Sequence, residues 1–393
     1  MTAVILVLNN FTHDSRVLRQ AETLAKCGYQ VYIFAIHAGE LPLSYCCADY
    51  RLYRFKLTTK RLPRTKPIQV VKYIECLLRM LWTALRLNPN LVHANDVDCL
   101  PIGLALKYLC RAQLIYDAHE LWFDAAYDRP YPRWVSWLIE RVEKAMAKKA
   151  DRVVTVCDSI AEHMSVTLNI RVPHVIRNIP ACNSNQDTDK SELHRLISLN
   201  SDVPVILNLG MISPGRGLET LLTAMRSVRS PAVAVLLGTL ENGGNSGFTF
   251  LDALKAQANA LGIRHRVRFV PAVPPHDLHR YARGATIGVA PIEATCLSYR
   301  YCLPNKLFEY IQAGLPVVTS DLPEMARLVT QYQIGEVFRA GDADGLACSL
   351  NSILESPRKL RFYRQQAVQA AHDLSWDREQ PKLIAIYDEL RAS

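Results

Sequence analysis

The sequence has 393 residues, of which 49% are hydrophobic and 21% charged. This composition excludes a disordered chain, and the length predicts about two domains. The net charge of +9 is concentrated in residues 1–175, where 23 Lys and Arg face 16 Asp and Glu. The positive half indicates an anionic partner such as phospholipid, a polyphosphate lipid or nucleic acid.

The 11 cysteines are scattered, and none forms the C-x-x-C pair of a zinc site or a redox motif. Their odd number leaves at least one thiol unpaired, which favours a reducing, cytoplasmic compartment. The sequence contains no run of about 18 uncharged apolar residues, so no transmembrane helix is predicted. The start, MTAVILVLNN, is typical of a strand rather than of a signal peptide.

The first elements predict a doubly wound α/β domain. An apolar run at residues 4–8 precedes an amphipathic segment at 16–26, and a second apolar run follows at 30–36. This order of strand, helix and strand opens a parallel sheet. The loop after the first strand carries Asn9 and Asn10 where a dinucleotide-binding G-x-G-x-x-G needs glycines, so we exclude a nicotinamide cofactor there.

A basic stretch at residues 51–66 contains seven Lys and Arg and no acid, and a helix is predicted after it at 68–87. One interpretation is a patch that binds an anionic membrane, with basic side chains for the headgroups beside an amphipathic helix. The other is a solvated loop followed by a helix that packs on the sheet. The sequence leaves both open.

Polar residues follow the next two predicted strands, at 91–94 and 114–116. Asp96 and Asp98 form a D-x-D that could hold a divalent cation, although acids are common in loops and helix caps as well. His119 follows the second strand, in the sequence YDAHE. Because open α/β sheets bind ligands at the carboxyl ends of their strands, His119 is a candidate functional residue.

The pattern then restarts after a segment rich in Asn, Asp and Ser at residues 178–202. Strands are predicted at 152–156 and 175–176 before it, and strands and helices at 205–209, 218–228, 233–237, 267–270, 286–290 and 335–338 after it. We therefore predict an α/β chain of two doubly wound domains, with boundaries at 1–178, a linker at 179–202, a second domain at 203–374 and a C-terminal helix in 375–393.

Residues 298–324 carry the clearest ligand signal. Proline and glycine bound a predicted helix at 305–313, because proline suits a first turn and glycine ends a helix. The start of such a helix binds phosphate through its unpaired N–H groups. Lys306 adds a full charge, and Glu309 lies on the same face, where it can bind ribose hydroxyls. The alternative is a surface ion pair between these two side chains.

Together these motifs resemble the retaining glycosyltransferases of family four. The motifs are DSRVLRQAETLAKCGYQV (14–31), LVHANDVD (91–98), YDAHE (116–120), LGMISPGRGLETLLTA (209–224), PNKLFEYIQAGLPVV (304–318) and the tail with Trp376. The resemblance covers nearly the whole chain. It implies the GT-B fold, two facing Rossmann-like domains with the last helix crossing back to the first. It also implies metal-independent transfer of a sugar from a nucleotide donor, with retention of the anomeric configuration.

The resemblance implies roles for particular residues. Arg216 and Lys306 would hold the donor diphosphate and stabilise the charge that builds on the departing nucleoside diphosphate, in place of a metal. Glu309 would bind the ribose, and His119 would lie near the transferred sugar. The rest of the implied donor site is Gly210, Gly238, Leu303, Pro304, Asn305 and Glu293, the last either a sugar ligand or a structural acid.

Three positions depart from the pattern of the family. Tyr301 replaces a glutamate that often contacts the donor sugar, Met211 replaces a frequent arginine, and Asn9-Asn10 replaces a glycine pair. The change at Tyr301 leaves the identity of the sugar open.

Two routes to retention also stay open. Double displacement needs an enzyme carboxylate, for which Asp117, Glu120 and Glu293 are candidates. Front-face attack within an ion pair uses a diphosphate oxygen as the base, and we favour that route.

We expect a UDP- or GDP-sugar donor and a glycan or lipid-linked acceptor, in surface polysaccharide or glycolipid synthesis at the cytoplasmic face of a membrane. No cofactor and no metal is expected. The rival interpretations are an epimerase or phosphorylase of the same fold, the latter needing lysine-bound pyridoxal phosphate, and a non-catalytic membrane-binding module. Nucleic acid is not expected, because no zinc finger or RNA-recognition motif accompanies the basic residues.

Overall fold

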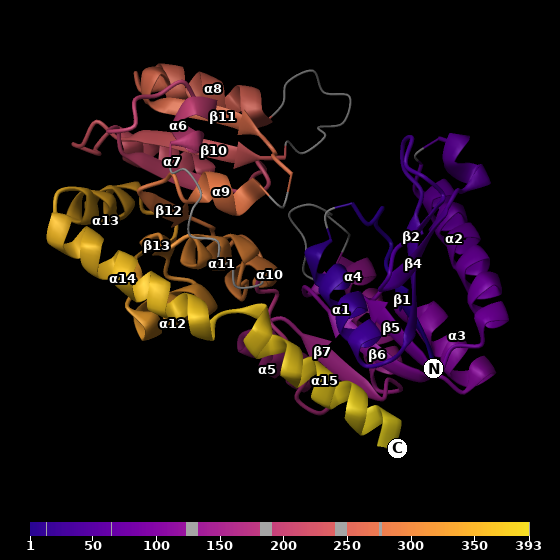
Figure 1. The fold of residues 1–393 in the computed structure, drawn as a ribbon. Helices are drawn as coiled ribbons and strands as arrows, with labels where there is room; N and C mark the ends of the chain where they lie inside the picture. Colours follow the sequence, from indigo (N-terminus) through magenta and orange to yellow (C-terminus); the bar gives the residue numbers. More distant parts are fainter. Residues whose placement is uncertain are drawn as a thin grey trace. The chain divides into compact units, whose positions relative to one another are not determined.

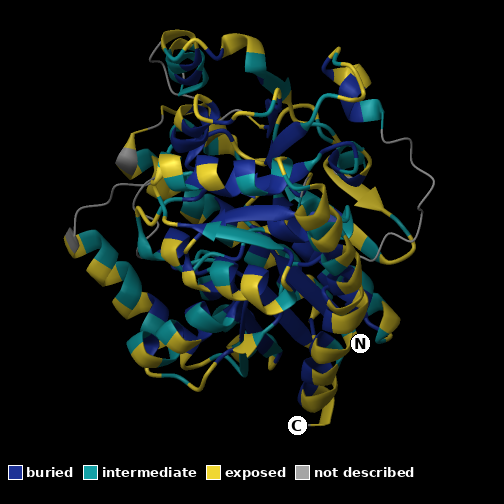
Figure 2. Cartoon of the chain, turned by 90° about the vertical axis from the view of Figure 1, so that its left-hand side faces the viewer, coloured by how far each residue is buried: buried dark blue, intermediate teal, exposed yellow. Residues whose placement is uncertain are grey.

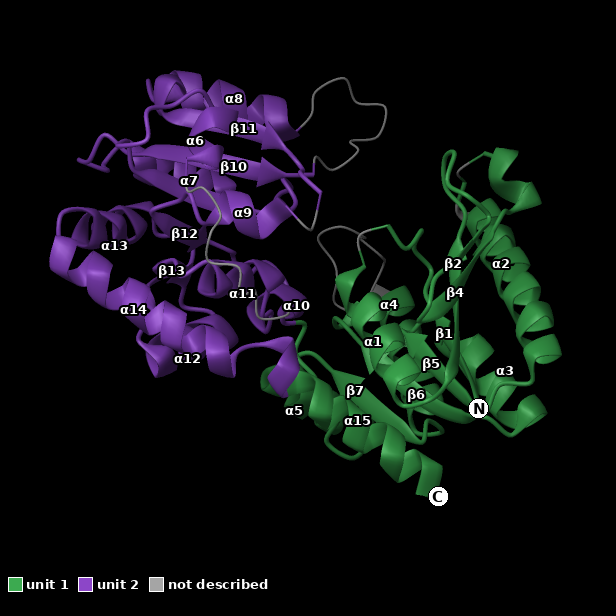
Figure 3. Cartoon of the chain, in the orientation of Figure 1, with its two compact units in different colours: residues 1–126, 130–178, 379–393 green, residues 127–129, 179–378 purple. Residues whose placement is uncertain are grey.

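The computed structural model describes residues 1–12, 14–63, 65–122, 133–180, 191–239, 250–274 and 277–392 (Figure 1). The chain forms two compact units (Figure 3). Unit 1 holds the described residues up to 178 together with those from 379 onward, and unit 2 holds residues 179–378. Each unit is built on one sheet of mostly parallel strands with helices packed against it, which confirms the predicted doubly wound α/β class.

Unit 1 contains an eight-stranded sheet in the order β3-β4-β2-β1-β5-β6-β7-β8. The strands are β1 (Thr2–Leu6), β2 (Gln30–Ile36), β3 (Ser44–Cys46), β4 (Tyr50–Phe55), β5 (Leu91–Asn95), β6 (Gln113–Ala118), β7 (Arg152–Thr155) and β8 (His174–Val175). All neighbours are parallel except β3 and β4. The strand order reverses at β1, which lies between β2 and β5, and sheets of this kind bind ligands at that reversal.

Helices cover both faces of this sheet. They are α1 (Ser15–Lys26), α2 (Lys66–Leu87), α3 (Leu100–Cys110), α4 (Arg133–Ala147), α5 (Asp158–Leu168) and the C-terminal α15 (Trp376–Ala392), with a short 3-10 helix at Thr58–Arg61. Successive side chains of β6 point to opposite faces. Asp117 bonds to Arg16 of α1, and Tyr116 donates to Glu143 of α4. On the face of α4, helices α2, α3, α4 and α5 form a row in which each contacts the next.

The C-terminal helix α15 joins unit 1 from its residue 379 onward, so the predicted return of the last helix to the first domain is confirmed. The hydroxyl of Tyr387 lies 3.3 Å from Nδ1 of His93, and Arg391 donates to the carbonyl of Cys27 at 3.0 Å. The side chain of Gln113 bonds to the carbonyl of Leu390. These contacts place α15 on the face of the sheet that α1 covers.

Unit 2 contains a six-stranded parallel sheet in the order β11-β10-β9-β12-β13-β14. The strands are β9 (Val205–Leu209), β10 (Val233–Gly238), β11 (Val267–Pro271), β12 (Ile287–Ala290), β13 (Val317–Ser320) and β14 (Gly335–Phe338). The helices are α6 (Glu192–Leu196), α7 (Leu218–Met225), α8 (Phe250–Ala260), α9 (Leu278–Ala282), α10 (Leu297–Arg300), α11 (Asn305–Gln312), α12 (Pro323–Tyr332), α13 (Ala343–Leu354) and α14 (Pro357–Asp373). Here the order reverses at β9, between β10 and β12.

The central strands of both sheets are buried, whereas the edge strands β3 and β14 are exposed or only partly buried. Figure 2 shows dark blue strands between partly exposed helices. Every residue of β9 and β10 is buried. Burial on both faces explains why such strands appear in the sequence as continuous apolar runs rather than as alternating patterns. The predicted strands at 30–36 and 205–209 are runs of this kind and coincide with β2 and β9. The predicted strand at 335–338 coincides with the partly buried β14.

Two segments differ from the sequence predictions. The basic stretch at 51–66 begins inside β4, where Leu52 is buried and the strand pairs with β2, so it is not simply a loop. The predicted linker contains α6, whose Leu193 is fully buried, so residues 192–196 pack as part of unit 2. Within the described residues, we find no helix that is long and apolar enough to cross a membrane.

Candidate functional site

A buried ionic network lies at the carboxyl ends of β5 and β6 in unit 1, next to the reversal of strand order. Its centre is Asp117, whose side chain is fully buried. Arg16 donates to both oxygens of this carboxylate, from Nε at 2.8 Å and from Nη2 at 2.7 Å. Gln20, one turn along α1, also donates to it, and Nε2 of His93 lies 3.4 Å away. Burial by itself would raise the pKa of Asp117, but Arg16 and His119 hold it well below its usual range.

His119 lies at the edge of this network and is about one-quarter exposed. Its Nδ1 is 3.4 Å from Asp96, and its Nε2 is 3.1 Å from the side-chain oxygen of Asn95 and 3.5 Å from Asp117. Burial lowers the pKa of an imidazolium, but here Asp96 and Asp117 outweigh it and raise the pKa of His119 to about 9. His119 is therefore a cation near neutral pH.

Asp96 has a structural task that explains part of the D-x-D signal. Its backbone is left-handed, with φ of 61°, and its carboxylate accepts a hydrogen bond from the backbone N–H of His119 at 3.0 Å. Asp98 lies nearby, and its carbonyl accepts from the hydroxyl of Tyr73 at 2.7 Å. Within the part of the chain that the structure describes, no group of three or more His, Cys, Asp or Glu is arranged to hold a metal ion.

The loop that follows β9 in unit 2 is held close to its neighbours by glycines. A Cβ on Gly238 would lie 1.6 Å from the carbonyl oxygen of Gly210, and a Cβ on Gly217 would lie 1.6 Å from that of Pro291. Gly217 also has φ of 69° and precedes α7. Only glycine permits both the close approach and this backbone conformation. The loop at 210–217 is thereby fixed beside the carboxyl ends of β9, β10 and β12.

Arg216 projects from this loop over the ring of Tyr299, with 4.7 Å between the guanidinium carbon and the ring centroid. Its Nε is buried and has no hydrogen-bond partner among the described residues. The hydroxyl of Ser213, in the same loop, is also buried and has no partner in the part of the chain that the structure describes. Buried polar groups are normally paired, so two unpaired ones in one short loop point to an anionic ligand that accepts from them.

Lys306 lies in the first turn of α11 and is 8% exposed. Its Nζ is 3.5 Å from the side-chain oxygen of Asn208 in β9. Its Cε is 3.8 Å from the position that a Cβ on Gly210 would take. Burial, with a further contribution from Arg216, lowers the pKa of Lys306 to about 7. Neither cation forms an ion pair with a described carboxylate, so the site combines positive charge with unpaired donors.

The remaining predicted donor residues surround this site. Pro304 caps α11 and Asn305 begins it, while Leu303 before them is buried. Glu309 is half-buried one turn further along, so its helical register with Lys306 is as predicted. The carboxylate of Glu293, after β12, accepts from the hydroxyl of Thr220 at 2.8 Å. Tyr301, at the predicted sugar-contacting position, ends α10. His119 belongs to unit 1 and is described with that unit.

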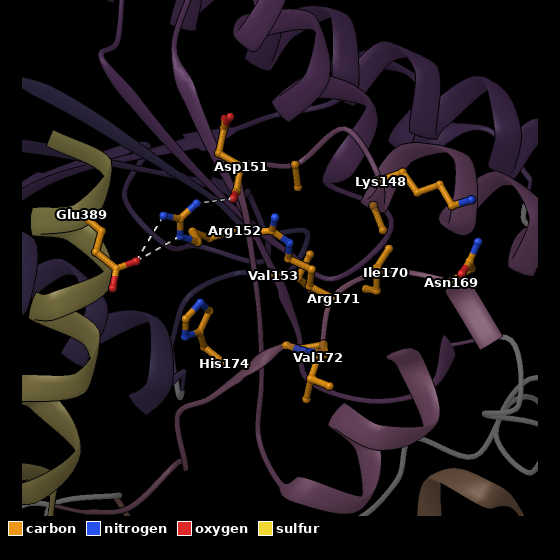
Figure 4. Close-up of a pocket in the computed structure, with 13 residues that line it drawn as sticks. Lys148, Asp151, Arg152, Val153, Asn169, Ile170, Arg171, Val172, His174 and Glu389 are labelled. Carbon is orange, nitrogen blue, oxygen red and sulfur yellow. Dashed lines mark hydrogen bonds and ion pairs between the residues drawn. The ribbon is translucent and has the colours of Figure 1, made fainter. Parts of the chain in front are cut away.

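A separate hollow lies elsewhere in unit 1. It has a volume of about 620 Å³, is lined at the start of β7 and next to α15, and contains none of the predicted site residues. Figure 4 shows Arg152 reaching Glu389 of α15, at 3.1 Å. This hollow lies at the amino ends of the strands, the opposite end from the ionic network.

Comparison with known proteins identifies the family. The profile described as glycosyl transferases group 1 matches residues 189–370, and that of the glycosyl transferase 4-like domain matches residues 13–179. The chain belongs to the group 1 glycosyltransferases. A D-inositol 3-phosphate glycosyltransferase of Nocardia farcinica is 26% identical to this glycosyltransferase over 94% of the chain and 83% of the relative. In two further relatives of that name, from Catenulispora acidiphila and Rhodococcus erythropolis, the match spans only 48% and 44% of their length.

Solved structures show the same GT-B fold as this glycosyltransferase. The sucrose-phosphate synthase of Thermosynechococcus elongatus has a TM-score of 0.83 at 18% identity and covers 100% of this chain and 99% of its own. Anabaena HepE, solved in complex with UDP-glucose, has a TM-score of 0.76 at 16% identity, with 99% and 100% covered. The predicted resemblance and fold are therefore confirmed.

Several residues that form the two sites of this glycosyltransferase were not predicted from its sequence. Arg16 and Gln20 of α1 bond to Asp117 across about a hundred positions of sequence. A polar pair four residues apart on the buried side of an amphipathic helix is a signal that could have indicated them. Tyr299, under Arg216, and Ser213 carry no sequence signal of their own.

Proposed function

We propose that this glycosyltransferase moves a hexose from a UDP- or GDP-sugar to a glycan or lipid-linked acceptor, with retention of configuration and without a metal. The observation that carries the proposal is the set of unpaired donors and cations in unit 2, Ser213, Arg216 and Lys306. They gather at the carboxyl ends of parallel strands, at the reversal of strand order, where such sheets bind nucleotides.

A diphosphate has the chemistry that this site lacks. Its oxygens accept from the guanidinium of Arg216 and the hydroxyl of Ser213, and its negative charge favours the ammonium form of Lys306. In the transfer step the bond between the anomeric carbon and the diphosphate breaks, and the electron pair leaves with the nucleoside diphosphate. Cations already fixed around the departing oxygens stabilise that charge without reorganising, which is where catalytic donors act most strongly.

The structure of unit 1 favours the front-face route over double displacement. Asp117 is a poor nucleophile, because both its oxygens are occupied by Arg16 and its environment is fully buried. His119 is already protonated near neutral pH, so it donates a hydrogen bond rather than removing a proton. In our proposal the proton of the acceptor hydroxyl goes to an oxygen of the leaving diphosphate.

Two observations bear on the identity of the donor. Glu309 lies one turn beyond Lys306 on α11, and in our proposal its carboxylate accepts from ribose hydroxyls. The structure of Anabaena HepE with UDP-glucose supports a uridine nucleotide and a hexose as the first candidates. We propose surface polysaccharide or glycolipid synthesis as the pathway, and Tyr301 as a residue that distinguishes this donor site from those with a glutamate.

A thermal-shift panel of UDP, GDP, ADP and their sugars tests the donor site. A ligand at 100 times its dissociation constant stabilises the protein by about 2.7 kcal/mol, and we expect one nucleotide to do so. The Arg216→Ala/Lys306→Ala double variant should lose this stabilisation. His119→Ala, in unit 1, is the matched control and should keep the nucleotide shift while losing turnover. Equal shifts in the double variant and the wild type would refute the proposal.

Attachment to an anionic membrane at its cytoplasmic face is part of the proposal, because a lipid-linked acceptor is presented there. The stretch at 51–66 supplies less of this surface than its charge predicts. Arg54 donates to the carbonyl of Asn10 at 2.9 Å, and Arg51 stacks on Tyr32. Arg64 and the side chain of Lys66 lie outside the described residues.

A further inference from the structure

Three neighbouring helices of unit 1 expose large apolar side chains to solvent. α3 contacts α2 on one side and α4 on the other, all on the face of the sheet opposite α1. α2 and α4 each present an apolar stripe outward, and Tyr108 and Leu109 of α3 are exposed between them. Monomeric proteins rarely expose apolar patches of this extent unless the patch binds something. We call the outward side of these helices the α2–α4 face.

The outward side of α2 reverses the usual pattern of a surface helix. Cys76, Met80 and Ala84 point inward and are buried. Val70, Ile74, Leu78 and Trp82, each four residues from the last, point outward, and Leu78 and Trp82 are 61% and 62% exposed. A helix that packs on a sheet normally turns polar residues to solvent. The apolar stripe of α2 is therefore additional to the side that packs on the sheet.

The charges beside this stripe are basic. Lys72, Arg79 and Arg86 lie along α2, and the guanidinium of Arg86 is 5.0 Å from the ring centroid of Trp82. The one acid of the helix, Glu75, is occupied: it accepts from Thr58, Thr59 and Arg79.

α4 repeats this combination. Trp134, Trp137, Leu138 and Val142 are spaced at helical intervals, and the two tryptophans are 68% and 54% exposed. The guanidinium of Arg141 lies 4.4 Å from the ring centroid of Trp137. Lys148 and Lys149, just past the end of the helix, are exposed. Glu143 is buried and bonds to Tyr116, so it does not reach this surface.

The chemistry of the α2–α4 face distinguishes between possible partners. A second copy of the chain, bound through the same face by a two-fold axis, would bring the basic side chains of one copy, among them Arg86 and Arg141, against those of the other. Like charges at such an interface repel. An anionic lipid surface supplies the opposite charge, and tryptophan beside arginine suits the boundary between headgroups and acyl chains. Apolar side chains next to basic ones are the composition of helices that lie in the membrane interface.

We propose that the α2–α4 face docks on an anionic bilayer, with Trp82 and Trp137 inserted at the level of the headgroups. The inference deepens the proposed function, since the lipid-linked acceptor would lie in the same bilayer. It moves the site of attachment from the basic stretch at 51–66 to the exposed sides of α2, α3 and α4. The binding needs both parts, apolar insertion and attraction of basic side chains to anionic headgroups.

Co-sedimentation of the full chain with vesicles tests the proposal. One set of vesicles contains phosphatidylcholine with roughly 30% phosphatidylglycerol, which gives a negative surface like that of a cytoplasmic leaflet. The other set contains phosphatidylcholine alone. We expect the wild type to sediment with the anionic vesicles and at least tenfold less with the neutral ones. The Trp82→Glu/Trp137→Glu double variant should lose at least tenfold of the anionic binding.

The matched control is Phe362→Glu/Val368→Glu, which changes two exposed apolar residues of α14 in unit 2. It should sediment as the wild type does. Equal sedimentation of the tryptophan variant and the control would overturn the proposal, as would a wild type that stays in the supernatant. A dimer in light scattering that the tryptophan variant converts to a monomer would also overturn it, in favour of a second copy. Turnover with a soluble acceptor, measured without vesicles, tests the proposed function separately.

Discussion

The two ligand-facing clusters of this glycosyltransferase differ in how their charges are balanced. In unit 1, Asp117 is neutralised by Arg16, and His119 faces Asp96 and Asp117. In unit 2, the guanidinium of Arg216 and the ammonium of Lys306 affect one another, and neither forms an ion pair with a described carboxylate. The charges of the first cluster are balanced within the protein. Those of the second are not balanced by the described residues, and an anion would balance them.

Removing a charge should therefore have opposite effects on stability in the two clusters. The largest effect is expected for Arg16→Met, because it leaves the buried Asp117 without its partner. Loss of one member of a buried pair costs about 3–5 kcal/mol. Urea unfolding followed by circular dichroism measures it. Arg226→Met, at an exposed position, serves as the control and should change little. A loss of stability below about 1 kcal/mol for Arg16→Met would mean that Asp117 does not depend on Arg16 for its charge balance.

Lys306→Met should instead leave stability unchanged or raise it, since the substitution removes a desolvated cation that has no acidic partner among the described residues. Its cost falls on the reaction: kcat/KM should decrease by about 10²–10³-fold, the scale for one lost catalytic donor. Steady-state kinetics with the donor found in the thermal-shift panel gives the number. Lys255→Met, on the exposed side of α8, is the comparison. Unchanged kinetics in Lys306→Met would remove Lys306 from the site.

The close approach of the loop at 210–217 to the Pro291 carbonyl can be tested by comparing the stability cost of alanine at two glycines of the same backbone conformation. Gly217 and Gly262 both have φ of 69°, but a Cβ meets the Pro291 carbonyl only at Gly217 and meets nothing within 4 Å at Gly262. Gly262→Ala should cost about 1 kcal/mol from the backbone alone. Gly217→Ala should cost more and should weaken nucleotide binding, because the loop that carries Arg216 must move. Equal losses in the two variants would show that the loop tolerates the shift.

The smallest effect should be the pH dependence of stability in the wild type, because the contributions of His119 and Lys306 change in opposite directions as the pH rises. The pKa of His119 is raised from 6.5 to about 9, so its stabilisation is complete below pH 6.5 and is lost as the pH rises through 9. The pKa of Lys306 is lowered from 10.5 to about 7, so its destabilisation is complete below pH 7 and is relieved above it.

Each variant should expose the contribution of the other cluster. Between pH 7 and 9, His119→Gln should become more stable as the pH rises, and Lys306→Met should become less stable. The slope is at most about 1.4 kcal/mol per pH unit for one proton. Urea titrations at several pH values in this range provide the test. Parallel slopes in the two variants would contradict the opposed pKa shifts.

The sequence was sufficient where structure depends on local pattern. Strands buried on both faces are continuous apolar runs, so β2 and β9 were located to the residue. The helix of Lys306 was also located, from the proline and glycine at its ends. β4 was missed because its apolar residues alternate with Arg51 and Arg54, which bond to other parts of the chain rather than to solvent alone.

Contacts between distant segments were beyond local pattern. The pairing of Arg16 with Asp117 joins α1 to β6, and no property of either segment alone indicates the partner. The ring of Tyr299 under Arg216 likewise depends on how α10 folds back on the loop at 210–217. The predicted ligand residues of unit 2 belong to short motifs that follow predicted strands, so more of that site could be predicted from the sequence. Their roles toward a donor stay predictions.

The C-terminal helix α15 also bears on how the protein is made. Unit 1 is begun by the first residues of the chain, yet it is finished only when residues 379–392 emerge, after all of unit 2 has been synthesised. Until then His93 lacks the contact with Tyr387, and the carbonyl of Cys27 lacks Arg391. On the ribosome, unit 2 can therefore complete its sheet first. Unit 1 is therefore the first part of the enzyme to be synthesised and the last to reach its final packing.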